Sequence, residues 1–218
     1  MSEIFQNIVV ILVLAVIVGA IFLFIRQRQA RNQQELRQLA AENDWEYQTL
    51  REPLAWGTRF TAPSWTIEAL SRSQGPEAGP GSSNIAMTTT WRADLPGNTL
   101  LIGPRSYTAD LGSMGDMLLR QVMELTLGPE SAGVREVAAG SETFRHAYAI
   151  WARDADAAHG LLDPGLEAAL LTWPGEKPVI KHTSDGISIE LRGVRLKKRD
   201  EILALAGLGQ TLLTRLKT

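Results

Sequence analysis

The feature that most constrains this chain is an uncharged apolar stretch near its start. Residues 8–25 contain only Ile, Val, Leu, Ala, Gly and Phe. As a helix rising about 1.5 Å per residue, the stretch is roughly 27 Å long, close to the roughly 30 Å hydrocarbon core of a bilayer. Only a helix satisfies its own backbone hydrogen bonds in lipid, which overrides the strand preference of Val and Ile. The sequence therefore predicts one transmembrane helix over residues 8–25.

Two other interpretations of this stretch are weaker. A cleaved signal peptide has a basic start and a small-residue cleavage site. Residues 1–7 contain Glu3 and no Lys or Arg, and Arg26 and Arg28 follow the stretch where a cleavage site would stand. A buried core helix is disfavoured because the run is too long and too uniformly apolar.

The charges that flank the stretch predict its orientation. Arg26, Arg28, Arg31 and Arg37 follow it, against Glu35 alone before residue 40. Lys and Arg accumulate on the cytoplasmic side of membrane helices. We therefore expect residues 1–7 to be a short tail outside a bacterial-type inner membrane, with the rest of the chain in the cytoplasm.

Small residues on the predicted span allow a helix–helix contact. Ala15 and Gly19 are four residues apart, the spacing of a small-xxx-small interface. Because small residues are common in membrane helices, a homodimer through this face is a minor expectation.

The remaining chain divides into a stalk and a domain. Residues 26–43 are mostly strong helix formers without Gly or Pro, which predicts a polar helical stalk. Its last turn carries Leu36, Leu39 and Ala40, and we expect it to dock on the domain. Residues 44–218 then form one soluble domain of ordinary size.

Short hairpins interleaved with helices predict an α+β domain with an antiparallel sheet. Strands are expected over residues 58–62, 64–72, 85–91, 99–102, 143–152, 178–182 and 186–191. Helices are expected from Ser113 to about residue 127, over residues 156–162 and from Pro164. An apolar stripe over residues 198–216 predicts an amphipathic C-terminal helix, in which Gly207 and Gly209 are expected to mark close packing. Residues 74–84 are expected to form a loop.

Composition excludes several function classes. The 218 residues contain 22 Lys and Arg against 24 Asp and Glu, a formal net charge of −2. Nucleic-acid binding needs a basic surplus, so nucleic acid is not an expected partner. The chain contains no cysteine, which excludes disulfides, thiolate catalysis and cysteine-bound metals.

No reactive constellation stands out, so we expect no catalytic, cofactor-binding or metal-binding site. His146, His159 and His182 lack the spacing of paired zinc ligands. The alternation of residues 143–152 places His146 on an apolar strand face, where a core histidine is expected, whereas His182 is expected to be exposed. Asp154 or Asp156 is explained by helix capping, and Ser113 by the same role.

Two groups of basic residues are candidates for lipid contact at a membrane surface. The first follows the predicted span and comprises Arg26, Arg28 and Arg31. The second precedes the last helix and comprises Arg195, Lys197, Lys198 and Arg199, next to Arg192. The alternative for the second group is a solvated loop balanced by Asp200 and Glu201. Among the tryptophans, Trp65 and Trp91 are expected in the core, and Trp56 and Trp173 beside a groove.

The order of features resembles that of uncharacterised bacterial single-pass membrane-anchored proteins with a cytoplasmic domain. The resemblance is carried by the apolar span, the stalk end LAAENDWEY at residues 39–47 and the segment FRHAYAIWARDADAAHGLL at residues 144–162. It implies a topology and no chemistry.

We therefore expect a membrane-tethered, non-enzymatic interaction or accessory domain, with the bilayer as one partner. Two alternatives stay open. A curved sheet closed by an amphipathic helix can hold a lipid or another amphiphile. A hydrolase whose residues converge only in the fold is the other alternative.

Overall fold

The computed structural model describes residues 2–73, 85–105, 123–124 and 126–217, and in the first helix the side chains of Leu14 and of Ile17 onward. The chain forms two compact units, Met1–Asp44 and Trp45–Thr218. The expected loop at residues 74–84 and the expected helix start at Ser113 lie outside the described residues.

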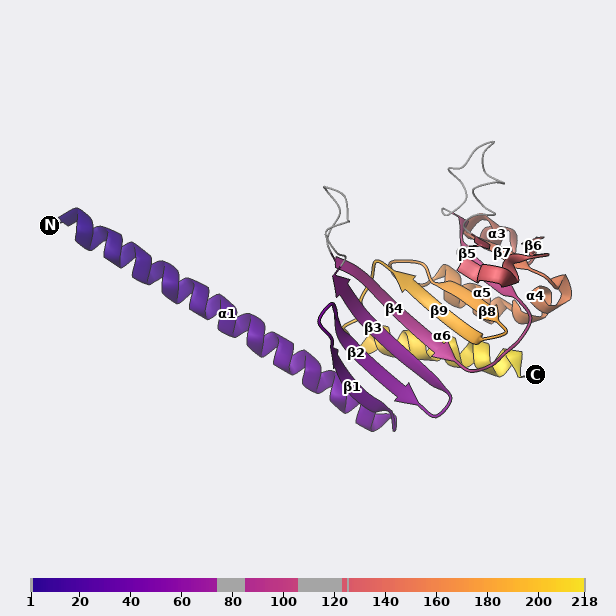
Figure 1. The fold of residues 1–218 in the computed structure, drawn as a ribbon, viewed down its shortest axis with the longest axis horizontal. Helices are drawn as coiled ribbons and strands as arrows, with labels where there is room; N and C mark the ends of the chain where they lie inside the picture. Colours follow the sequence, from indigo (N-terminus) through magenta and orange to yellow (C-terminus); the bar gives the residue numbers. More distant parts are fainter. Residues whose placement is uncertain (1, 74–84, 106–122, 125, 218) are drawn as a thin grey trace. The chain divides into compact units, whose positions relative to one another are not determined.

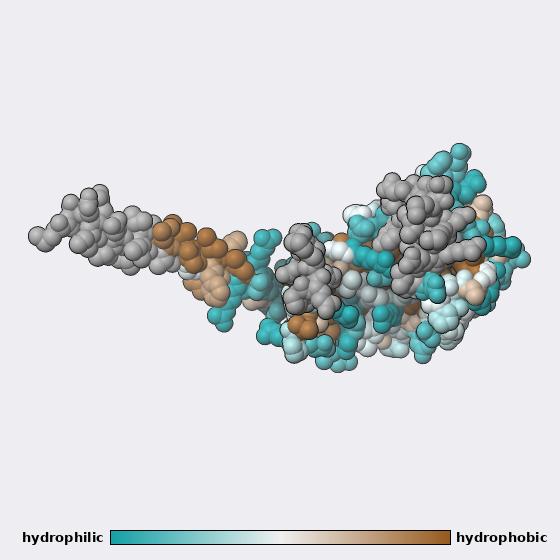
Figure 2. Space-filling view, turned by 45° about the horizontal axis from the view of Figure 1, so that its top comes forward, coloured by the Kyte–Doolittle hydropathy of each residue, from teal (hydrophilic) through white to brown (hydrophobic). Residues whose placement is uncertain are grey.

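The first unit is one helix, α1 (Ser2–Glu42), 41 residues long. In the last turn of α1, the side-chain amide of Asn43 donates to the Leu39 carbonyl at 2.9 Å. Asp44 then adopts a left-handed backbone conformation (φ 55°). The described apolar side chains from Leu14 to Ile25 are 48–66% exposed. Figure 2 shows this apolar part of α1 in brown, with hydrophilic side chains toward its C-terminal end.

None of the helices is both long and apolar enough to cross a membrane when the described residues alone are considered.

The second unit is built on a nine-stranded sheet in which every strand pairing is antiparallel. Its strands are β1 (Glu46–Arg51), β2 (Ala55–Ala62), β3 (Trp65–Ser73), β4 (Ile85–Ala93), β5 (Leu100–Pro104), β6 (Arg135–Val137), β7 (Tyr148–Ala152), β8 (Val179–Thr183) and β9 (Gly186–Arg192). Their order is β1-β2-β3-β4-β9-β8-β5-β7-β6 (Figure 1). The expected α+β class with an antiparallel sheet is confirmed.

The sheet combines strands from parts of the chain that are far apart in sequence. β1 to β4 follow one another as a meander, and β4 then pairs with β9 from the far end of the chain. The β8–β9 hairpin thereby joins the meander to a second group of strands, β5, β7 and β6.

Helices cover one face of this sheet. They are α3 (Glu142–Ala147), α4 (Ala155–Leu161), α5 (Pro164–Leu171) and α6 (Arg199–Leu216), with a short 3₁₀ helix η3 (Gly128–Ser131) elsewhere. Figure 1 shows α6 behind the sheet, crossing the strands of its centre. The apolar stripe predicted for this helix is buried, from Ile202 to Leu213.

The main core lies between α6 and the sheet. Phe60, Ile67 and Trp91 occupy neighbouring positions on β2, β3 and β4, and all three are fully buried. Gly209 of α6 lies directly over the Trp91 indole, where an added Cβ would overlap the ring. Close packing at Gly209 is therefore confirmed, whereas Gly207 has open space beside it.

A second, smaller core lies on the opposite face. Leu101 is in register with Lys181 and Trp151 on the neighbouring strands, so the three side chains share one face. This is the face that points away from α6. Its buried neighbours are Met123, Leu127, Ala149, Trp151 and Val179, with Val134 against them. This cluster covers only the part of the opposite face formed by β8, β5 and β7.

One expected strand is wrong in its first half. Residues 142–147 form helix α3, and only residues 148–152 form a strand, β7. The Ser141 hydroxyl accepts a hydrogen bond from the Phe144 backbone N–H at 3.2 Å and caps this helix. The two edge strands β1 and β6 were not predicted.

Candidate functional site

The sheet face opposite α6 is mainly polar over β1–β4 and β9, with Leu50 and Leu70 as its large apolar residues. Every second residue of these strands points to it, and the register aligns Gln48, Arg59, Glu68, Thr90 and Glu190 in one row. Of the unit's described helices, none lies on this part of the face (Figure 1). We refer to this surface, formed by the outward residues of β1–β4 and β9, as the open face.

Two sets of ion pairs hold the side chains of the open face in place. Arg59 pairs with Glu68 at 2.6 Å across β2 and β3. Glu190 pairs with Arg192 at 3.2 Å and with Lys181 of the neighbouring strand at 3.8 Å. These groups are only 22–38% exposed, so the pairs are partly shielded from solvent.

Positive charge is in excess around Glu190. Burial lowers the pKa of the Lys181 ammonium; Glu190 opposes this shift, while Arg192 and Arg92 add to it. Lys181 and Arg192 thus share the Glu190 carboxylate, and Arg92 adds a third positive charge near Lys181. Arg92, which sits beside Thr66 and Ser188 in the register, is exposed and has no ion pair with any described residue.

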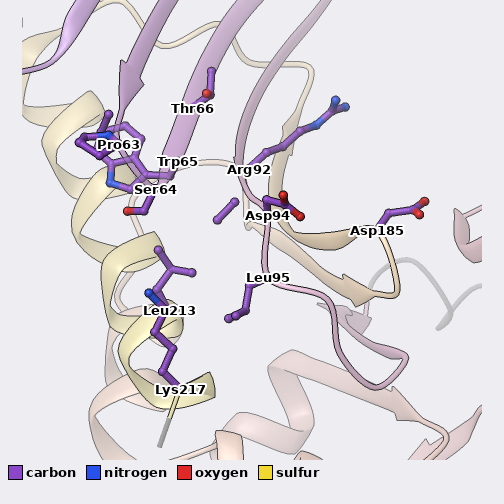
Figure 3. Close-up of a pocket in the computed structure, with 12 residues that line it drawn as sticks. Pro63, Ser64, Trp65, Thr66, Arg92, Asp94, Leu95, Asp185, Leu213 and Lys217 are labelled. Carbon is purple, nitrogen blue, oxygen red and sulfur yellow. The ribbon is translucent and has the colours of Figure 1, made fainter.

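A hollow of about 630 Å³ opens beside Arg92 at one end of the sheet. It lies between the β2–β3 turn, the segment that leaves β4, the β8–β9 turn and the end of α6. Figure 3 shows the carboxylates of Asp94 and Asp185 on one side of it, and Leu213 of α6 and Lys217, which follows α6, on the other. Its walls therefore carry charges of both signs.

A second hollow of about 550 Å³ lies beside α3, β6 and β7. Arg105 and Glu136 form an ion pair in it, and Arg105 Nε donates to the Arg145 carbonyl at 2.6 Å. Tyr148 lines it too, but burial raises the pKa of this phenol and its hydroxyl donates to the Leu170 carbonyl at 3.2 Å. Arg105, Glu136 and Tyr148 are thus engaged in structural bonds.

The histidine predictions are reversed by the fold. His146 lies on helix α3 rather than on a strand, and its side chain is 81% exposed. Its Nε2 lies 3.8 Å from Oε1 of Glu142. His182, expected to be exposed, is 7% exposed, because the segment after β4 covers it. Its Nε2 donates to the Leu95 carbonyl at 3.0 Å, and its ring lies against Gly97.

The aspartates serve as helix caps, as expected. Asp154 accepts hydrogen bonds from the backbone of Asp156 and Ala157 and caps α4. Asp163 caps α5 by accepting from Leu166 N–H at 2.8 Å, and it also pairs with Arg215 of α6. These carboxylates are therefore explained by local structure.

Glu130 of η3 was not singled out from the sequence. It accepts hydrogen bonds from the side chain and backbone N–H of Ser184 and from the Thr99 hydroxyl, at 2.8 Å for Thr99. These bonds, led by the one from Ser184, lower the pKa of its carboxyl. Glu130 thereby joins η3 to the β8–β9 turn.

Of the basic residues expected to contact lipid before α6, Lys197, Lys198 and Arg199 are exposed and Arg195 is not. Arg195 is half-buried, which lowers the pKa of its guanidinium, and Tyr47 lies near enough to oppose that shift. Lys198 pairs with Glu201 at 3.3 Å, and the Lys197 and Lys198 backbones donate to the same carboxylate. The Lys197 side chain is exposed. Arg26, Arg28 and Arg31 are exposed on α1.

The tryptophans divide mostly as expected. Trp65 and Trp91 are buried in the main core. Trp56, at the start of β2, is 37% exposed, and Trp173 is half-buried after α5.

Among the described residues, no three His, Cys, Asp or Glu side chains lie close enough to hold a metal ion. The open face was missed in the sequence because its residues come from five strands. The signal that could have indicated this face is a polar residue at every second position of a strand. Such residues are Thr66 and Glu68 in β3, Thr90 and Arg92 in β4, and Glu190 in β9.

The comparisons with known proteins find no match for this chain, whether among protein-family models, curated proteins or solved structures.

Proposed function

We propose that this protein is a membrane-tethered domain that binds a partner on its open face and carries out no chemistry of its own. The tether is residues 8–25, with the N-terminus outside and the second unit in the cytoplasm. The partner-binding surface is the open face around Arg92.

The tether rests on the chemistry of the first helix. Residues 8–25 lack any polar side chain, and the described ones from Leu14 to Ile25 are largely exposed on α1. Leaving that many large apolar side chains in water is unfavourable by about 1.5–3 kcal/mol each, whereas a bilayer accepts them. The four arginines that follow favour a cytoplasmic C-terminal side.

The single observation that carries the binding role is the exposed Arg92 on a mainly polar face that none of the described helices covers. A half-covered antiparallel sheet stays soluble when its outer face is polar. Around Glu190 that face also carries the positive charges of Arg92 and Arg192, next to Lys181 of the neighbouring strand β8. An acidic surface on a partner is complementary to this arrangement.

The titratable groups support a role without catalysis. Asp154 and Asp163 cap helices, Glu130 joins η3 to a hairpin, and Glu201 binds the backbone before α6. Both described hollows have mixed polar and apolar linings that include charged side chains, which gives the amphiphile-binding alternative no specific support.

Complementation of a deletion strain tests the binding role. Arg92→Glu reverses a charge on the open face and should abolish complementation while the protein remains folded. Arg135→Glu is the matched control, because Arg135 is equally exposed but lies on β6, away from the open face.

A second variant addresses catalysis directly. His146→Ala combined with Asp156→Ala removes two exposed reactive side chains and leaves the Asp154 cap intact; complementation should persist. Loss of complementation in this folded variant, together with a fully active Arg92→Glu protein, would favour the hydrolase alternative over our proposal.

A further inference from the structure

The apolar side of the sheet extends beyond the elements that cover it. On the face that packs against α6, β4 presents Trp91, Thr89, Met87 and Ile85 in turn. Gly209 of α6 lies on Trp91, and the segment after β9 lies on Thr89, whose hydroxyl bonds the Val194 carbonyl at 3.0 Å. Beyond Thr89, cover by described residues ends: Met87 and Ile85 are 39% and 44% exposed.

These two side chains belong to a larger apolar surface. The register aligns Arg51, Trp56, Ser71 and Met87 across β1 to β4, so Trp56 and Met87 point to the same face. Leu54, which accepts a hydrogen bond from Ser73 N–H, lies at the same end and is 64% exposed. We call Leu54, Trp56, Ile85 and Met87 the sheet-end patch.

Basic residues surround the sheet-end patch. Arg51 is the direct cross-strand neighbour of Trp56, and Arg72 ends β3 on the other face. Lys197 and the half-buried Arg195 follow β9 at this same end of the sheet. Arg51, Arg72 and Lys197 are exposed and form no ion pair with a described residue.

Acidic groups at this end are fewer. The described ones are Glu52, Asp200 and Glu201, and Glu201 is already bonded to Lys198 and to the backbone before α6. Among the described residues, the rim of the sheet-end patch therefore has a net positive charge. Apolar side chains that include a Trp, within a basic rim, match the interface of an anionic bilayer, where acyl chains lie beneath negative headgroups.

We propose that the sheet-end patch rests on the anionic lipid surface to which the chain is tethered. This inference depends on the tether of the proposed function and adds a second point of membrane contact. The open face stays free for a partner, since the two surfaces use different residues.

The absence of cysteine allows a direct test with single-cysteine labels on the full chain. Met87→Cys places an environment-sensitive fluorophore in the sheet-end patch. Ser64→Cys, in the exposed β2–β3 turn at the opposite end of the sheet, is the matched control. Both proteins are reconstituted into phosphatidylcholine vesicles with and without phosphatidylglycerol, with the domain on the outer surface.

In phosphatidylglycerol vesicles, the fluorescence emission of the label at position 87 should shift to shorter wavelength and become protected from quenching by iodide. The label at position 64 should remain quenchable by iodide. Arg51→Gln or Lys197→Gln in the Met87→Cys background should each lower the docked-to-undocked ratio about fivefold, the effect of one basic residue near an anionic surface. Leu54→Ser should weaken docking without changing the melting temperature, because Leu54 packs little in the domain.

Three results would overturn the inference. A label at position 87 as quenchable as the one at position 64 in carbonate-resistant vesicles would refute docking and leave the tether standing. Protection of the label at position 87 from iodide that persists in detergent and rises with protein concentration would show that a second copy of the chain, rather than lipid, covers the patch. Release of the whole chain by carbonate would refute the tether itself.

Discussion

Gly209 of α6 and Trp91 of β4 are in direct contact, and the indole occupies the space that any side chain at position 209 would need. Trp91 is fully buried and is flanked by Ile67 and Ile189 in the sheet, so it has no room to move aside. The position of α6 on the sheet therefore depends on the absence of a Cβ at this residue.

Gly209→Ala should accordingly destabilise the domain by about 1–3 kcal/mol, the usual cost of overpacking a filled core. Gly207→Ala is the control: it lies two residues earlier in the same helix with open space beside it. That variant should be neutral or more stable by up to about 1 kcal/mol, because Ala favours helix over Gly. Chemical denaturation of both variants in detergent measures the difference; equal effects would contradict the contact.

His182 should make stability dependent on pH. Burial lowers its pKa, with the Leu95 hydrogen bond and Glu130 opposing the shift, so the folded state holds the neutral ring. The unfolded state binds the proton more readily below a pH of about 6.5, and stability therefore falls as pH drops from there toward the lower folded pKa.

His182→Gln tests this account of the pH dependence. The amide keeps a donor for the Leu95 carbonyl but does not titrate. Unfolding free energies of wild type and variant should converge as pH falls below about 6.5, before the carboxylates titrate. A constant difference between the two proteins from neutral pH downward would show that His182 is not the titrating group.

The strand prediction for residues 143–152 was wrong in its first half because apolar residues four positions apart are compatible with both a strand and a helix. Phe144 and Tyr148 are four residues apart, so they share a face in a strand and also in a helix. In the structure they still stack, with ring centroids 5.1 Å apart. His146, midway between them, lies on the same side in a strand but on the far side in a helix. It is therefore exposed.

The burial of His182 required information that is distant in the sequence. The residues that cover it, Leu95 and Gly97, precede it by more than eighty positions and reach it because β4 and β9 pair. Periodicity predicted most strands, the β8–β9 hairpin and the apolar face of α6, because those patterns are local. The turn at residues 96–98 also predicts a hairpin of residues 85–91 with residues 99–102, and this is wrong: β4 pairs with β3 and β9, and β5 pairs with β7 and β8. The order of the sheet, and with it the open face, depends on long-range pairing that local patterns do not contain.

Asp163 should contribute to stability mainly as a helix cap. Asp163→Ala removes the acceptor of the Leu166 N–H and should cost about 1 kcal/mol. Asp163→Asn keeps that acceptor and loses only the ion pair with Arg215, which is partly exposed and worth about 0–1 kcal/mol.

Thermal unfolding of the two Asp163 variants, alone and with Arg215→Ala, separates these contributions. The coupling free energy between Asp163→Asn and Arg215→Ala should be about 0–1 kcal/mol, the usual value for a partly exposed ion pair. If Asn at position 163 proves as destabilising as Ala, the ion pair rather than the cap stabilises α5.

The membrane tether is tested most directly by the location of the full chain in cells. Membranes from cells that carry a C-terminal reporter fusion are extracted with alkaline carbonate, and the side occupied by the reporter is determined by its activity. We predict that the protein stays in the pellet and that a cytoplasm-active reporter works. Release into the supernatant, or activity only of a reporter that requires export, would contradict the account.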